Sequence, residues 1–115
     1  MTSVKENKMT SKIVKHIKLK KIPYLEIIRV TPGVFGSMRG VSDLLFCYHG
    51  FFIAIEMKVP GNSPTDHQER FLKKIEKAKG FSYICHSKEE VMSALNESLK
   101  SIKRRGAIAT EKDNA

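Results

Sequence analysis

The sequence predicts an α/β (α+β) fold in which a mixed central sheet is flanked by helices, with the element order α-β-β-β-α-β-α. Two observations lead to this prediction. Short runs rich in β-branched and aromatic residues alternate with stretches in which apolar residues recur at helical spacing. Segments containing glycine and proline separate these stretches where the chain has to turn.

The N-terminal stretch is expected to be helical. Apolar residues recur at helical spacing within a lysine-rich run, at Ile13, Val14 and Ile17. This pattern predicts an amphipathic helix over residues 4–20 that ends before Pro23, because proline cannot continue a helix.

Three runs typical of strands follow, over residues 24–30, 42–48 and 51–59. The segment 31–40 between the first two contains three glycines and no periodicity, so we expect a loop there. The second and third runs are separated by His49-Gly50, which is the spacing of a β-hairpin with a two-residue turn.

The second half of the chain predicts a helix, a short strand and a last helix. The first of these helices is expected to begin with Ser63 as N-cap and Pro64 at its first position, and to end at Gly80. Its predicted buried stripe consists of Phe71, Leu72 and Ile75. A strand over 81–85 follows, and Ser87 with Glu90 predicts a capping box for the last helix. The apolar stripe of that helix consists of Val91, Leu95, Leu99 and Ile102.

The composition bounds the class of protein. A chain of 115 residues fits one domain, predicted over residues 1–105 and followed by a polar, disordered tail over 106–115. The absence of a long apolar run predicts a soluble, intracellular (cytoplasmic) protein, in which Cys47 and Cys85 are expected to be buried and reduced. The net charge of +9, with basic residues crowded near both ends of the chain, favours a polyanionic partner.

The hairpin brings acidic and basic groups to one place. If His49-Gly50 is a two-residue turn, Tyr48 pairs with Phe51, and continuing the antiparallel ladder places Asp43 opposite Glu56. Lys58 follows Glu56 by two residues and therefore lies on the same face of the strand. Two carboxylates this close together repel each other unless a cation lies between them or one is protonated.

These groups are candidates for a metal-dependent hydrolytic site. Oxygen ligands without histidine or cysteine favour Mg²⁺ or Mn²⁺, which can polarise a phosphodiester and activate water, while Lys58 would hold that water or neutralise charge on the phosphate. The alternative is a salt-bridge cluster on a solvated sheet face. Gln68 lies on the buried stripe of the second helix, where it either orients a carboxylate or is a partly exposed amide at the helix start.

These motifs resemble the virus-type replication-repair nuclease (VRR-NUC) domain of the PD-(D/E)xK restriction-endonuclease-like superfamily. The similarity covers roughly residues 24–95 and depends on four features in order, namely RGVSD at 39–43, IEMK at 55–58, SPTDHQ at 63–68 and the glycine at 80. The resemblance implies that Asp43, Glu56 and the backbone carbonyl of Met57 bind the metal ion, and that Lys58 and Gln68 are catalytic.

Two positions depart from the family pattern. Ser42 replaces the usual proline before the aspartate, which removes a backbone restraint but no catalytic group. The family often has a glutamate on the first helix, and aligning on Ile13 and Val14 puts Thr10 at that position. Glu6 lies one helical turn earlier and would join the metal site only if the helix is shifted.

The resemblance implies a structure-specific DNA endonuclease, acting as a homodimer on branched DNA such as Holliday junctions or flaps, in replication, repair or recombination. The alternative is a non-catalytic DNA-binding protein on the same fold. A small basic protein that binds RNA or an acidic protein is less favoured, because the sequence shows no interleaved aromatic residues for base stacking. The expected DNA contacts are Lys12, Lys15, Arg29, Arg39, Lys103 and Arg104.

Overall fold

The computed structural model describes residues 4–30 and 42–105, and the structural statements below concern these residues. The elements follow one another as α1 (Val4–Leu19), β1 (Leu25–Arg29), β2 (Leu44–Tyr48), β3 (Phe51–Met57), α2 (Asp66–Lys77), β4 (Phe81–Cys85) and α3 (Lys88–Arg104). This order confirms the predicted fold class. The predicted loop at 31–40 and the predicted tail at 106–115 lie outside the described residues.

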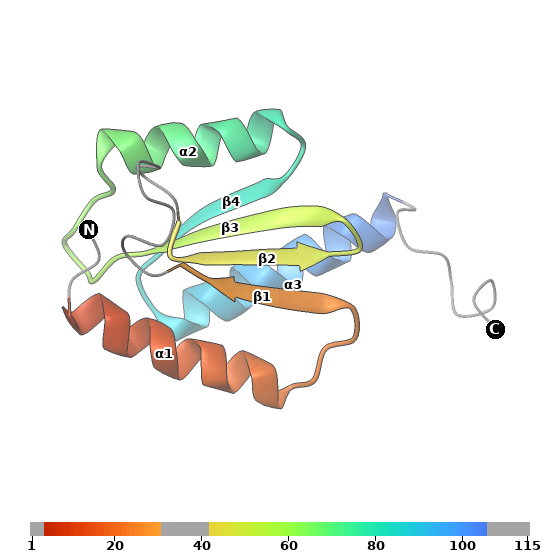
Figure 1. Ribbon diagram of the computed structural model, residues 1–115, viewed down its shortest axis with the longest axis horizontal. Helices are drawn as coiled ribbons and strands as arrows, with labels where there is room; N and C mark the ends of the chain where they lie inside the picture. Colours follow the sequence, from red (N-terminus) through yellow and green to blue (C-terminus); the bar gives the residue numbers. More distant parts are fainter. Residues whose placement is uncertain (1–3, 31–41, 106–115) are drawn as a thin grey trace.

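The four strands form one mixed sheet in the order β1-β2-β3-β4 (Figure 1). Strand β2 runs antiparallel to both of its neighbours, β1 and β3, whereas β4 runs parallel to β3. A parallel neighbour requires a crossover connection, and α2 provides it between β3 and β4.

The predicted register of the hairpin is confirmed. Tyr48 pairs with Phe51 and Leu44 pairs with Ile55, so the ladder extends from the turn to the start of β2. The turn residues His49 and Gly50 both have positive φ, 49° and 86°, as a two-residue turn matched to the strand twist requires.

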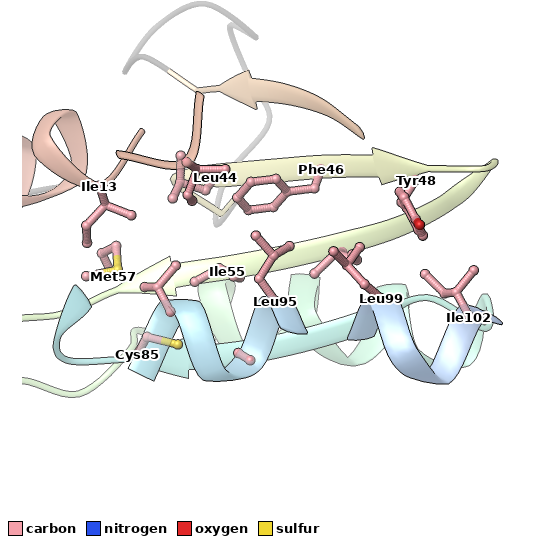
Figure 2. Packing of buried hydrophobic residues seen from close by; sticks show 14 residues of the cluster. Ile13, Leu44, Phe46, Tyr48, Ile55, Met57, Cys85, Leu95, Leu99 and Ile102 are labelled. Atoms are coloured by element: carbon pink, nitrogen blue, oxygen red, sulfur yellow. The ribbon is translucent and has the colours of Figure 1, made fainter. Parts of the chain in front are cut away.

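The two faces of the sheet have different coverings, α2 on one face and α1 with α3 on the other (Figure 1). The larger core lies on the α1/α3 face, where Phe46, Ile55 and Leu95 pack together (Figure 2). The smaller core consists of Leu45, Ala54 and Leu72 under α2. Because side chains alternate along β3, Glu56 lies on the α2 face with Ala54, and its neighbour Met57 is buried in the larger core.

Helix α2 begins later than predicted, with Thr65 rather than Ser63 as the N-cap. The Thr65 side chain accepts a hydrogen bond from the backbone N–H of Gln68 at 3.2 Å, and Gln68 Oε1 accepts one from the Thr65 N–H at 2.8 Å. This reciprocal capping box satisfies two amides that have no partner within the helix. Pro64 therefore precedes the helix instead of occupying its first position.

The C-terminal end of α2 also differs from the prediction, because the helix ends at Lys77. The N–H of Gly80 donates to the carbonyl of Ile75 and that of Lys79 donates to Glu76, which is the Schellman pattern. Lys79 occupies the left-handed position with φ of 73°, where glycine is usually found. Gly80 is required for a different reason, since a Cβ there would lie 2.9 Å from the carbonyl oxygen of Phe52 and 2.8 Å from Ile75 Cγ2.

Half of the predicted capping box of α3 is present. The Ser87 hydroxyl accepts from the N–H of Glu90 at 3.1 Å, as predicted. Glu90 Oε1 accepts from the N–H of His86 at 3.2 Å, not from Ser87, and lies 3.5 Å from the His86 ring nitrogen Nδ1. Glu90 thus binds His86, the residue before the N-cap, and not the N-cap Ser87 itself.

Substitutions at the adjacent residues Lys79 and Gly80 should change stability in opposite directions. Lys79→Gly relieves an unfavourable left-handed conformation and should raise the free energy of unfolding by up to about 1 kcal/mol. Gly80→Ala forces a Cβ into occupied space and should lower it by about 1–3 kcal/mol. Urea denaturation followed by circular dichroism measures both, and a stabilised Gly80→Ala variant would contradict the close packing.

Candidate active site

The side chains singled out in the sequence lie at one end of the sheet, below the first turn of α2. Asp43 directly precedes β2, Glu56 is near the end of β3, and Lys58 follows that strand. Gln68 lies in the first turn of α2. All four are buried, with exposed fractions of 7%, 0%, 5% and 5% in that order. The alternative of a salt-bridge cluster on a solvated sheet face is therefore wrong.

Asp43 is held between two neighbouring strands. Its backbone carbonyl accepts a hydrogen bond from the Val30 N–H at 2.9 Å, which continues the β1–β2 ladder past β1. Its side-chain Oδ2 accepts one from the backbone N–H of Met57 at 3.2 Å. The Asp43 carboxylate is thus held against the backbone of β3, directly beside Glu56. The register of the hairpin places Asp43 at this position.

Glu56 receives groups from two directions. Gln68 Nε2 donates to Glu56 Oε2 at 3.2 Å, and the Lys58 ammonium nitrogen lies 3.9 Å from the same oxygen. A fully buried carboxylate is costly unless hydrogen bonds and opposite charge compensate for the lost water. The amide and the ammonium provide that compensation.

Gln68 connects the helix start to the carboxylate. Its Oε1 completes the capping box by accepting from the Thr65 N–H, while its Nε2 is directed to Glu56. The structure therefore agrees with the interpretation of Gln68 as a residue that orients a carboxylate. It does not agree with the alternative, in which Gln68 is a partly exposed amide at the helix start. The sequence analysis missed Thr65, although the T-x-x-Q spacing from Thr65 to Gln68 is itself a capping-box pattern.

The donor set suits a small divalent cation. The site contains two buried carboxylates, one of which lies beside the Lys58 ammonium. Their oxygens together with the nearby backbone of Met57 are the hard ligands that Mg²⁺ and Mn²⁺ prefer. Within residues 4–30 and 42–105, no group of three or more histidine, cysteine, aspartate or glutamate side chains gathers to hold a metal ion. A cation here would thus need backbone, water or substrate oxygens to complete its coordination.

Among its described side chains, the first helix presents Thr10 to the interior. Thr10 is 1% exposed and lies on the same helix face as Ile13 and Ile17, which are equally buried. The alignment that puts Thr10 at the family's glutamate position therefore agrees with the helix orientation. Glu6 belongs to α1, but its side chain lies outside what the structure describes, so its part in a metal site stays a prediction.

Of the basic residues expected to contact DNA, Lys12 and Lys15 are exposed on α1, and Arg39 lies outside the described residues. Lys103 and Arg104 are at the end of α3, beside Ile102, which packs at the Tyr48 end of the sheet, opposite to the site (Figure 2).

The guanidinium of Arg29 is directed to helix α1. It donates to the Ser11 hydroxyl, and to the backbone carbonyl and side-chain oxygen of Asn7 at 3.0 and 3.1 Å. Arg29 therefore ties the end of β1 to the N-terminal half of α1. These contacts favour a structural role for Arg29 over the predicted DNA contact.

The element order and the mixed four-stranded sheet are those of a restriction-endonuclease-like fold. Among solved structures, the chain is similar to a "VRR_NUC domain protein", with a TM-score of 0.68 and 20% sequence identity over 83% of this chain and 88% of that chain. No family model and no curated protein matches the sequence. At this identity the similarity shows a shared fold, which confirms the fold implied by the motifs. No helix among the described residues has the length and apolar character needed to cross a membrane.

The two cysteines are both free, but only Cys85 is buried as predicted, whereas Cys47 is partly exposed. Burial, with a smaller contribution from the charge of Glu90, raises the pKa of the Cys85 thiol to about 12. The thiolate is the reactive species, so Cys85 should not react near neutral pH.

We therefore expect one thiol equivalent to react with Ellman's reagent at pH 8 in the folded protein, and two after unfolding in guanidinium. Cys47→Ser should remove the reactive equivalent and Cys85→Ser should not. Two rapidly reacting thiols in the native protein would contradict the burial of Cys85.

Proposed function

We propose that this chain is a VRR-NUC nuclease that hydrolyses phosphodiester bonds in DNA with the help of Mg²⁺ or Mn²⁺. The observation that carries the proposal is the buried cluster of Asp43, Glu56, Lys58 and Gln68 at the end of the hairpin. The name of the structurally similar VRR_NUC domain protein indicates a nuclease-type domain, and the motifs of this chain resemble those of that type except at Ser42 and Thr10.

The cation would be held by the carboxylates of Asp43 and Glu56 and by the backbone carbonyl of Met57. When bound, it would polarise the phosphodiester and lower the pKa of the attacking water. Thr10 supplies no carboxylate, so the proposal requires only one cation. Glu6 would matter only for a second cation.

Lys58 and Gln68 have different tasks in this proposal. The attacking water would lose a proton and form a bond to phosphorus, the bond from phosphorus to the leaving deoxyribose oxygen would break, and that oxygen would take up a proton from water. Negative charge increases on the phosphate oxygens meanwhile, and the Lys58 ammonium would stabilise that charge or hold the water. Gln68 would position the Glu56 carboxylate for cation binding through its amide, which donates to Oε2.

DNA as the partner agrees with the net charge of +9 and with the exposed lysines on α1. Branched DNA as the preferred substrate and a homodimer as the acting form are proposed from the resemblance to junction-cutting members of the family. A symmetric dimer places two sites around one two-fold axis, which suits cutting two strands of a junction.

Removing any of the three charged groups should abolish cutting. Asp43→Ala, Glu56→Ala and Lys58→Ala should each lower the cleavage rate by at least about 100-fold, since each removes a group that acts on the phosphate or its cation. The measurement uses labelled duplex, flap, splayed and four-way DNA with Mg²⁺, with Mn²⁺ and with EDTA. Lys73→Ala, an exposed lysine of α2, is the matched control.

Two results would overturn the proposal. Cutting that survives all three substitutions would show that the activity resides elsewhere. Salt-sensitive DNA binding by the wild-type protein without cutting in either metal ion would favour a non-catalytic DNA-binding protein.

The positioning role of Gln68 can be separated from its capping role. Gln68→Met keeps the apolar volume but removes the donor to Glu56, and should lower kcat about 10- to 100-fold with little change in KM. Thr65→Ala removes one capping acceptor and should cost about 1 kcal/mol of stability while kcat changes far less. Equal losses of kcat in both variants would indicate that Gln68 acts only through the helix start.

A further inference from the structure

A pocket lies at the other end of α2, away from Asp43 and Glu56. Its volume is about 270 Å³, and its lining comes from the hairpin turn and from the turn between α2 and β4. Both turns lie on the right-hand side of Figure 1. The lining residues include His49, Phe52, Ile75 and Lys79.

The floor of this pocket is an exposed aromatic ring. Phe52 is 44% exposed and points to the α2 face, because it alternates with the buried Ile53 of the other core. Tyr24, 75% exposed, packs on the His49 ring with centroids 4.9 Å apart and extends the aromatic surface beyond the pocket.

Two residues with left-handed backbone flank the ring. His49 has φ of 49° and Lys79 has φ of 73°, although glycine fits this conformation at lower cost. Strain of this kind tends to occur where a side chain is needed at that position. Gly80 fixes the placement of Lys79, because its close approach to the Phe52 carbonyl locks the α2–β4 turn against β3.

The pocket lining carries one ammonium group, that of Lys79, and no carboxylate. On the strands of the same sheet face, the acidic residues are Glu56, four residues further along β3, and Glu26, which lies opposite Cys47 and therefore two strands away from Phe52. An exposed ring and a lysine in one pocket suit a base and its phosphate, because bases stack on aromatic rings and lysine binds phosphate as a point charge.

We propose that this pocket binds one unpaired nucleotide of a DNA strand, with the base on Phe52 and a phosphate at Lys79. The inference rests on the proposed nuclease function and specifies its substrate as DNA with a single-stranded segment. A base pair inside a duplex has both faces stacked on its neighbours, whereas an unpaired base can offer a face to Phe52.

The spacing of the two sites fits one DNA strand. Phe52 precedes Glu56 by four residues in β3, which corresponds to about 13 Å at the rise of a strand. At the 3.4 Å rise of a stacked strand in a duplex this length corresponds to about four nucleotides, and an extended single strand covers it with fewer. The pocket would then hold a nucleotide at most about four positions from the phosphate at the candidate active site.

The test measures binding without cutting, in EDTA, by fluorescence anisotropy with labelled oligothymidylate and with a blunt hairpin duplex. Phe52→Leu keeps an apolar side chain but removes the ring, and should weaken oligothymidylate binding at least about fivefold while duplex binding stays within twofold. Phe52→Tyr keeps the ring and should bind like the wild type. Leu19→Ala, at an exposed apolar residue of α1, is the matched control and should change neither.

Lys79 is tested through salt dependence. Lys79→Gly should lower the slope of log K against log salt for oligothymidylate by about 0.7, the contribution of one phosphate contact to a single strand. The Lys79→Gly variant is expected to be at least as stable as the wild type, so misfolding cannot explain a decrease in this slope. Lys100→Gln removes an exposed lysine of α3, which covers the other sheet face, and should leave the slope unchanged.

Cys47 gives a readout that needs no activity. It lies directly opposite Phe52 in the ladder, on the same face. Saturating oligothymidylate should slow its reaction with Ellman's reagent at least about fivefold in the wild type and not in Phe52→Leu at the same DNA concentration.

Equal effects of Phe52→Leu on single-stranded and duplex DNA, or no effect on either, would overturn the inference. If instead Phe52→Leu leaves DNA binding unchanged and converts a dimer to a monomer in light scattering, the pocket is an interface between two copies of the chain, which also overturns it. The proposed nuclease function and the proposed nucleotide pocket can be refuted independently of each other. A wild-type protein that never cuts but binds oligothymidylate through Phe52 refutes the nuclease function alone.

Discussion

The two-residue turn at His49-Gly50 determines where the two carboxylates of the candidate active site lie relative to each other. Because the turn pairs Tyr48 with Phe51, the ladder brings the start of β2 to the end of β3 and aligns Asp43 with Glu56. A shift of one residue would move Asp43 to the opposite face of the sheet, into the apolar core. The positive φ of both turn residues is therefore a requirement of the site, although the turn lies at the other end of the sheet.

The aligned carboxylates are buried, so protein groups and not water determine how they are oriented. Glu56 is fully buried, and a carboxylate in such a place needs directed partners instead of water. Gln68 and Lys58 approach it from the helix and from the end of the strand, while Asp43 is held by a backbone N–H of β3. Each partner comes from a different segment, so the geometry depends on the whole packing of α2 on the sheet.

Much of this arrangement could be predicted from the sequence because it depends on local periodicity. Strand alternation and a two-residue turn are sufficient to place Asp43, Glu56 and Lys58 on one face. The helix ends could not be predicted as well, because Ser63 and Thr65 both offer capping oxygens and only the packed structure selects Thr65. The contacts of Arg29 with α1 join residues far apart in sequence, and no spacing rule predicts them.

The shared amide of Gln68 has a consequence for the order of events during folding. One side chain both completes the first turn of α2 and supplies the donor to Glu56. A chain whose second helix has not yet docked therefore lacks the oriented carboxylate, even if its hairpin has already formed. For a protein proposed to cut DNA, this arrangement withholds the competent site from partly folded chains and makes it available only when the crossover helix is in place.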